Sequence, residues 1–203
     1  MPLRALVINC TLKPSPATSN TEALARVVMD ALEERGATTE IVRAVDHDIR
    51  PGVSADEGPG DAWPAIRERV MAADILVIAT PTWLGQPSSV CRRVMERMDA
   101  MLSDSDDDGR PVAYGRVGGI VVTGNEDGAH HIIGVVAQGL IDLGYTVPGQ
   151  AWTYWNRGPG PGPTYLEEDE GHEWSHRTGR AAAANLVAVA EALRAHPMPV
   201  PPE

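Results

Sequence analysis

Five short strand-like runs recur along the chain, and each is followed, after a polar loop, by a segment whose apolar residues have helical spacing. Most of these runs are strongly apolar, which is typical of strands covered on both faces of a parallel sheet. They lie at residues 3–9, 38–45, 74–79, 117–122 and 146–152. Strands that alternate with helices in this way predict an α/β fold with a doubly wound parallel sheet and right-handed crossovers.

The helices are predicted from their apolar spacing and their end signals. Ser19 and Glu22 fit a capping box at the start of the first helix, and Gly36 fits its end. Further helices are expected at residues 61–73, 88–102, 129–143 and 178–196. A Gly/Pro-rich stretch at about residues 156–165 predicts an ordered loop or flap before the last helix. The length of 203 residues suits a single domain over residues 1–203.

Composition excludes several classes of function. Acidic residues outnumber basic ones 28 to 17, which argues against a nucleic-acid binder. No run approaches the ~20 apolar residues that span a bilayer, so we expect no membrane insertion. Met1 leads directly into a strand-like run, without the pattern of a secretory signal, and Cys10 and Cys91 form neither a metal motif nor a disulfide framework. These features favour a cytoplasmic protein.

Three polar loops follow the first, third and fourth runs, at Cys10–Thr21, Thr80–Gly85 and Thr123–His130. In an open parallel sheet, loops at the carboxyl ends of neighbouring strands line one crevice. The three loops would surround that crevice if the strand order is 2-1-3-4-5, an order that the pattern alone does not establish. We therefore place the function at these loops.

The first loop has the chemistry of a phosphate site at a helix N-terminus. Thr11, Ser19 and Thr21 carry hydroxyls, Asn20 and Thr21 could present backbone N–H groups, and Lys13 is the only lysine in the chain. An ordinary capped helix after a polar turn is the alternative. Neither GxxxxGK[ST] nor GxGxxG occurs, so a mononucleotide is favoured over a nucleoside triphosphate or a dinucleotide.

The order of these loops resembles the flavodoxin-like NAD(P)H-dependent FMN reductase family, over about Leu3 to Trp155. That family has a Ser/Thr/Arg-or-Lys/Ser/Asn loop, then a P-T-aromatic-x-G loop, then a T-G-N/G-x-x-G loop. The resemblance implies a flavodoxin-like doubly wound five-stranded parallel sheet of order 2-1-3-4-5, with helices on both faces and FMN as cofactor. The chain departs from the family by carrying Asn9 and Cys10 where an early Gly-Ser pair is usual.

The resemblance also assigns the cofactor contacts. It implies that the FMN phosphate lies on Thr11, Lys13, Ser19, Asn20 and Thr21. The ribityl chain and one edge of the ring would lie beside Pro81, Thr82, Trp83, Leu84 and Gly85. The pyrimidine end would meet Thr123, Gly124, Asn125, Glu126, Asp127 and Gly128. His130 or His131 would assist there or simply face solvent, and Trp152, Tyr154 and Trp155 would flank the ring or belong to the core.

The function implied is hydride transfer from NADPH or NADH through FMN to a quinone, a free flavin or another small acceptor. No catalytic side chain is named, because the cofactor carries the difficult step. The resemblance further implies a homodimer or homotetramer, and we expect the stretch from Arg157 to Tyr165 to supply the contact between subunits.

Three alternatives stay open. An electron-carrier flavodoxin suits the acidic charge but would have a compact T-x-T-G-x-T first loop. A zinc hydrolase would use His172, Glu173 and His176 of an HExxH match, which follows an acidic, glycine-broken segment and has no obvious third ligand. A regulatory protein of the same fold that has lost the flavin is the third.

Overall fold

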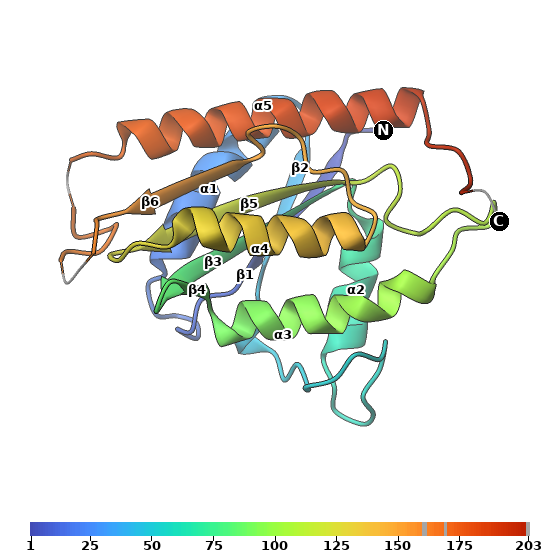
Figure 1. Ribbon diagram of the computed structural model, residues 1–203, viewed down its shortest axis with the longest axis horizontal. Helices are drawn as coiled ribbons and strands as arrows, with labels where there is room; N and C mark the ends of the chain where they lie inside the picture. Colours follow the sequence, from blue (N-terminus) through green and yellow to red (C-terminus); the bar gives the residue numbers. More distant parts are fainter. Residues whose placement is uncertain (160–161, 169, 202–203) are drawn as a thin grey trace.

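The chain folds around a parallel sheet with strand order β2-β1-β3-β5-β6, as Figure 1 shows for the computed structural model. The structure describes residues 1–159, 162–168 and 170–201. The parallel strands are β1 (Arg4–Asn9), β2 (Thr38–Arg43), β3 (Ile75–Trp83), β5 (Val117–Gly124) and β6 (Trp152–Asn156). A short strand, β4 (Gln86–Pro87), pairs antiparallel with the end of β3. Counted along the chain, the parallel strands confirm the predicted order 2-1-3-4-5.

Helices cover both faces of the sheet, as predicted. On one face lie α1 (Asn20–Glu33) and α5 (Glu173–Ala195). On the other lie α2 (Trp63–Ala72), α3 (Ser89–Met98) and α4 (Ala129–Asp142). Two short 3₁₀ turns, η1 (Ala44–Asp46) and η2 (Asp99–Ser103), follow β2 and α3. Within the described residues, no helix combines the length and apolar character that crossing a bilayer requires.

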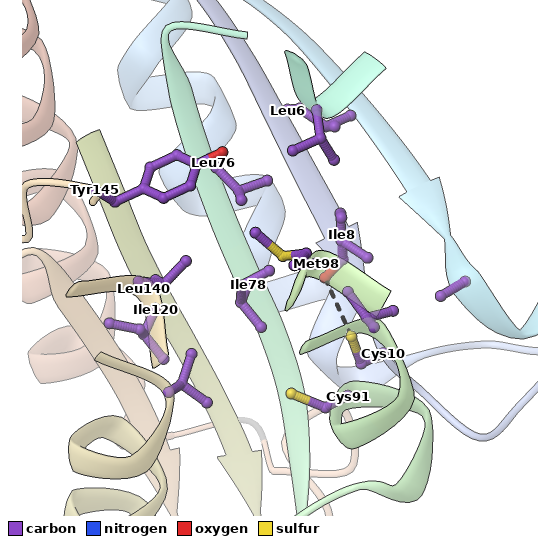
Figure 2. Close-up of a cluster of buried hydrophobic side chains, with 14 of the residues drawn as sticks. Leu6, Ile8, Cys10, Leu76, Ile78, Cys91, Met98, Ile120, Leu140 and Tyr145 are labelled. Carbon is purple, nitrogen blue, oxygen red and sulfur yellow. Dashed lines mark hydrogen bonds between the residues drawn. The ribbon is translucent and has the colours of Figure 1, made fainter. Parts of the chain in front are cut away.

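Alternate residues of the central strands supply the two cores. Leu6, Ile8, Leu76, Ile78 and Ile120 point toward α2, α3 and α4, and Figure 2 shows them packed with Met98 and Leu140. Their neighbours, including Ala5, Val7, Val77 and Val121, point toward α1 and α5. Because both faces of β1, β3 and β5 are buried, these strands read as continuous apolar runs in the sequence.

The fifth parallel strand lies later in the chain than predicted. Of the predicted residues 146–152, only Trp152 belongs to it; Thr146 makes an isolated bridge to Val117, and the strand begins at Trp152. Pro148 and Gln150, whose φ is 56°, belong to a turn that carries the chain to the sheet edge. From Trp152 onward burial alternates along the strand, which is the period-two pattern of an edge strand with two different faces.

The boundaries of two helices also differ from the prediction. The last helix begins at Glu173 instead of Thr178, because its polar first turn is held against β6: Thr153 Oγ1 donates to the Ser175 carbonyl oxygen at 2.7 Å. The helix predicted to reach residue 102 ends its α-helical part at Met98 and continues as η2.

The long loop after β2 is held by a buried ion pair. Arg97 Nη2 donates to Asp61 Oδ2 at 2.8 Å, and both side chains are fully buried. Arg97 also donates to the carbonyl oxygens of Arg50 and Ser54 and lies over the ring of Trp63. Burial alone would raise the pKa of Asp61, but the hydrogen bonds from Arg97 and from backbone N–H groups hold that pKa well below its usual range.

The two cysteines are core residues. Cys10 and Cys91 are both buried and unpaired, and Figure 2 places them together below Met98. Hydrogen bonding to Cys91 and burial raise the pKa of the Cys10 thiol well above its usual value. Ser88 joins the two segments, because its hydroxyl donates to the Cys10 carbonyl oxygen and accepts from the Cys91 N–H.

Candidate functional site

The three predicted loops meet at the carboxyl edge of the sheet, at the left in Figure 1. They enclose a pocket of about 180 Å³, which is smaller than the ~300–1,000 Å³ of most ligand clefts. A bound nucleotide would therefore extend beyond its mouth. The predicted residues that line it are Thr11, Lys13, Asn20, Thr21, Pro81, Thr82, Trp83, Thr123, Gly124 and Asn125. Among the described residues that form the lining, Lys13 alone is charged.

The remaining predicted residues lie outside the pocket lining, and most of them support the loops. They are Ser19, Leu84, Gly85, Glu126, Asp127 and Gly128. Ser19 is the N-cap of α1: its Oγ accepts the Glu22 N–H at 3.1 Å. Only this half of the predicted capping box forms, because the Glu22 carboxylate accepts from Arg43 at 2.7 Å and from Arg26.

The first loop is held from β2 by residues that the sequence analysis missed. Arg43 donates to the carbonyl oxygens of Lys13 and Ala17 at 3.3 and 2.7 Å. Asp46 accepts from both the backbone N–H and the hydroxyl of Ser15, at 2.8 and 2.6 Å. These partners are 26 to 31 positions from the loop, so no local pattern could have identified them. The loop is fixed in shape before any ligand binds, which lowers the entropic cost of binding.

Asn9, which stands where the family usually has an early Gly-Ser pair, braces the first loop. Its buried side chain accepts from the Thr11 N–H at 3.1 Å and donates to Ser19 Oγ at 3.4 Å. Thr11 Oγ1 in turn accepts the Lys13 N–H at 3.3 Å. The departure from the family pattern therefore leaves a braced loop whose Thr11 hydroxyl lines the pocket.

The three loops are also joined to one another. Thr21 and Thr123 share a hydrogen bond of 2.7 Å between their Oγ1 atoms, which links the first and third loops. The Leu84 N–H donates to Glu126 Oε1 at 2.8 Å, which links the second and third. A Cβ on Gly128 would lie 2.6 Å from the Gly85 Cα, so these loops touch through bare backbone.

The second loop begins inside β3. Thr80–Trp83 belong to the strand, and a turn at Leu84 and Gly85, with φ of 52° and 70°, leads into β4. Thr82 is buried at the pocket wall, and among the described residues its Oγ1 has no hydrogen-bond partner. Buried polar atoms normally have partners, so an unpaired hydroxyl here fits a polar group of a bound ligand.

Residues after β5 give the pocket a fourth wall. Trp155 of β6, Thr164 and Tyr165 complete its lining. Asn125 Nδ2 donates to the Gly162 carbonyl oxygen at 3.1 Å, and Asn20 Oδ1 accepts the Leu166 N–H at 3.0 Å. In the Gly/Pro-rich stretch, residues 160 and 161 lie outside the described part of the chain. The sequence pointed to Trp155 but not to Thr164 and Tyr165. The only signal for these two residues is that they end the Gly/Pro-rich stretch.

The other aromatic residues considered beside the ring lie elsewhere. Trp152 and Tyr154 are on the opposite face of β6 from Trp155, packed toward α4. Both make edge contacts with His130, at centroid distances of 5.7 and 5.1 Å. His131 is exposed and hydrogen-bonds Gln86 at 3.0 Å. None of these four residues lines the pocket.

The HExxH match occupies the start of α5. His172 is the N-cap residue and His176 lies in the first turn, with their ring centroids 5.6 Å apart. In the described part of the chain, no three His, Cys, Asp or Glu side chains are grouped so that they could hold a metal ion. Both histidines contact Tyr165.

Comparison with known families and proteins gives consistent matches. The sequence model of the NADPH-dependent FMN reductase family matches residues 3–158. The 8-demethyl-8-aminoriboflavin-5'-phosphate synthase of Streptomyces davaonensis is 36% identical over 207 residues, covering 97% of this chain and 80% of that protein. A Mycobacterium bovis protein named divalent metal cation transporter MntH is 44% identical over 200 residues; the match covers 95% of this chain, which spans only 29% of that protein's length.

Solved structures agree with the observed topology. RosB, crystallised with bound 8-demethyl-8-formylriboflavin-5'-phosphate, has a TM-score of 0.89 and 37% identity, over 97% of this chain and 82% of its own. An apo NADH:FMN oxidoreductase has a TM-score of 0.61 at 14% identity, over 96% of this chain and 92% of its own. An archaeal flavodoxin has a TM-score of 0.58 at 10% identity, over 93% and 99%. The last two show a shared fold alone, which is flavodoxin-like.

Proposed function

This chain belongs to the NADPH-dependent FMN reductase family, and from that membership we propose that it binds FMN in the pocket described above. We further propose that it transfers hydride from NADPH or NADH to a quinone, a free flavin or another small acceptor. The observation that supports this most directly is the joining of the three predicted loops around one pocket, with a lysine and a helix N-terminus together in its lining. When bound, FMN would supply the redox chemistry, accepting hydride at its N5 atom.

The phosphate end of the proposed site is the start of α1. Lys13 brings positive charge, Thr11 a hydroxyl, and Asn20 and Thr21 the backbone N–H groups of a first helical turn. Because Ser19 already caps the helix, we assign it to holding this turn and not to direct contact with the phosphate.

The ring end of the proposed site lies between the second and third loops. Pro81 and Trp83 give apolar surface, and the unpaired Thr82 hydroxyl gives one polar contact. Glu126 and Gly128 act behind the lining by keeping the two loops together. These residues orient the flavin and limit water on the side that they cover, while the mouth stays open for the nicotinamide and the acceptor.

An open mouth also favours the expected homodimer or homotetramer, which we retain as a proposal. Trp83 and Leu84 are consecutive large apolar residues at the pocket mouth, 53% and 91% exposed, and together they offer apolar surface that a partner could cover. A second subunit seated there would cover part of the ring. Analytical ultracentrifugation of the protein and of Leu84→Asp tests this, because a dimer built on this rim should become monomeric in the variant.

The decisive experiment is an absorption spectrum of the purified protein with FMN, followed by anaerobic titration with NADPH and with NADH. Bleaching of the bound flavin by either nucleotide, and reoxidation on adding a quinone, would support the proposal. An electron-carrier flavodoxin would bind FMN but would not be bleached without a separate reductase. Failure to bind FMN at all would contradict the proposal as a whole.

A second candidate function uses the flavin as substrate. The likeness to RosB in complex with an 8-formyl flavin phosphate, at a TM-score of 0.89, favours it. In that case the pocket would hold the 5'-phosphate as before, but the flavin leaving the protein would differ from the flavin that entered. Mass spectrometry of flavin recovered after incubation under air separates the two candidates: a cofactor is recovered unchanged, whereas a substrate is altered at its C8 substituent.

A further inference from the structure

We propose that Tyr165 is a contact residue for bound FMN and that His172 and His176 are its positioning residues. The proposal rests on the proposed function, because it concerns the same pocket. It assigns a role to the HExxH match that flavin binding by the three loops leaves unexplained. It also extends the site past residue 158, where the match to the family ends.

Tyr165 lines the pocket together with Asn20 and Thr21, which belong to the proposed phosphate end. The N–H of the next residue, Leu166, donates to Asn20 Oδ1 at 3.0 Å, so the two segments are joined directly. The preceding residue, Thr164, also lines the pocket, and a further turn at Thr164–Glu167 is closed by a backbone bond of 3.0 Å. Figure 1 shows this segment between β6 and α5, at the same end of the sheet as the loops.

Tyr165 is held by contacts that fix both its ring and its hydroxyl. Its ring stacks on that of His172, with centroids 4.2 Å apart and planes inclined by 22°. The rings of Tyr165 and Trp155 lie nearly perpendicular, with their centroids 5.7 Å apart. The hydroxyl is 2.7 Å from His176 Nε2. A tyrosine with its ring and its hydroxyl both engaged has little rotational freedom, so its place in the wall is set before the ligand arrives.

The hydrogen bond between Tyr165 and His176 lies in a partly buried site. Burial, and then the charges of His172 and Arg180, lower the pKa of His176, which favours its uncharged ring near neutral pH. The tautomer of that ring decides whether Nε2 or the Tyr165 hydroxyl is the donor.

The spacing of the two histidines explains why both reach one tyrosine. Residues four apart on a helix lie on the same face, one turn above the other. The same property makes His-x-x-x-His a metal motif in other proteins. In this chain Glu173 lies between them in the sequence but is exposed, and the shared face is covered by Tyr165.

The test measures FMN dissociation constants by quenching of flavin fluorescence, without turnover. Tyr165→Ala should raise the dissociation constant about tenfold, the usual effect of losing a buried aromatic contact. Tyr154→Ala is the matched control, because Tyr154 is also an aromatic residue of this region but lies outside the pocket lining. Thermal unfolding of each apo variant checks that it is folded. Tyr165→Phe keeps the ring in the core and should raise the dissociation constant about fivefold by losing the bond to His176.

The positioning role has its own readout. His176→Leu should weaken FMN binding about as much as Tyr165→Phe, and His176→Gln, which can still accept the hydroxyl proton, should restore most of the affinity. In the Tyr165→Phe background, His176→Leu should have no further effect, because the bond through which it acts is already absent. Additive losses would overturn the positioning role.

The outcomes separate this inference from the proposed function. If the wild-type protein binds FMN and Tyr165→Ala binds it equally well, Tyr165 is not a contact residue and the proposed function stands. If the wild-type protein does not bind FMN, both are overturned. Loss of affinity in Tyr165→Ala and Tyr165→Phe, with Tyr154→Ala unchanged, supports the inference.

Discussion

Thr21 and Thr123 are 102 positions apart in the sequence, and their Oγ1 atoms share a buried hydrogen bond of 2.7 Å. Thr21 lies in the first turn of α1 and Thr123 is the last residue but one of β5, so this contact fixes the distance between the proposed phosphate end and the third loop. We expect Thr21→Val to leave a buried hydroxyl unpaired, to cost about 1–3 kcal/mol of stability, and to weaken FMN binding. Urea denaturation and fluorescence titration measure the two effects.

The matched control for this prediction is Thr178→Val. Thr178 and Thr153 form a similar hydroxyl pair, 2.8 Å apart, between α5 and β6 and outside the pocket lining. Thr178→Val should lower stability less than Thr21→Val, because Thr153 still donates to the Ser175 carbonyl oxygen, and it should leave FMN affinity unchanged. Equal affinity in both variants would show that the Thr21–Thr123 contact has no part in shaping the site.

Lys13 and Ser19 should have different effects when replaced. Lys13→Gln removes the charged side chain from the pocket lining and should weaken FMN binding about fivefold, with little effect on riboflavin, which has no phosphate. Ser19→Ala removes the N-cap and should cost about 1 kcal/mol of stability. Arg35→Gln, which changes the charge just beyond the far end of α1, is the control. A loss of riboflavin affinity equal to that of FMN would contradict a phosphate role for Lys13.

Gly128 should tolerate no side chain. Its φ is 125°, and a Cβ there would lie 2.6 Å from the Gly85 Cα. Gly128→Ala should therefore push the second and third loops apart, cost about 2 kcal/mol, and abolish tight FMN binding. Gly134→Ala, inside α4, which follows Gly128, is the contrasting variant: nothing lies within 4 Å of its Cβ, so it should gain about 0.5–1 kcal/mol in stability and bind FMN normally. Thermal unfolding and flavin titration distinguish the two.

The buried pair of Asp61 and Arg97 predicts a dependence of stability on pH. Asp61→Asn should cost about 3 kcal/mol near neutral pH, because it leaves a buried guanidinium without its counter-charge. The folded-state pKa of Asp61 lies below its ordinary value of 3.8, so the contribution of the ionised pair is fully present above 3.8 and is lost as the pH falls below it.

Urea denaturation over a series of pH values measures this dependence. The gap in unfolding free energy between the wild-type protein and Asp61→Asn should be constant from neutral pH down to about pH 5 and should narrow on further acidification. A gap that stays constant through the whole series would mean that pairing with Arg97 does not lower the pKa of Asp61 in the folded protein.

Local signals were sufficient for much of the fold. The run from Leu3 to Asn9 is apolar because both faces of β1 are buried, and Ser19 marks a helix start because the cap contact spans only three residues. The fifth strand lies later than predicted because residues 146–152 have the apolar composition of a strand but turn at Pro148 and Gly149. A proline has no backbone N–H to donate to a neighbouring strand, so this segment does not pair with β5 as a strand.

The site was predictable only where it follows a strand directly. The three loops could be located because parallel strands bring their carboxyl ends to one edge. Tyr165 could not, since its place in the pocket depends on its contacts with His172 and His176, and on the bond from the neighbouring Leu166 N–H to Asn20, which no periodicity encodes. Arg43 was hidden for the same reason, although it holds two carbonyl oxygens of the first loop.

The anchoring of the first loop by Arg43 and Asp46 has a thermodynamic consequence. Both residues belong to the end of β2 and the turn after it, and β2 is an outermost strand of the sheet, paired on one side alone. Outermost strands open locally more readily than central ones. If a ligand binds more tightly when the first loop is held by Arg43 and Asp46, then, by linkage, the bound ligand must also raise the free energy needed to open β2. Slower amide hydrogen exchange at Val42 in the liganded protein would be the signature of that reciprocity.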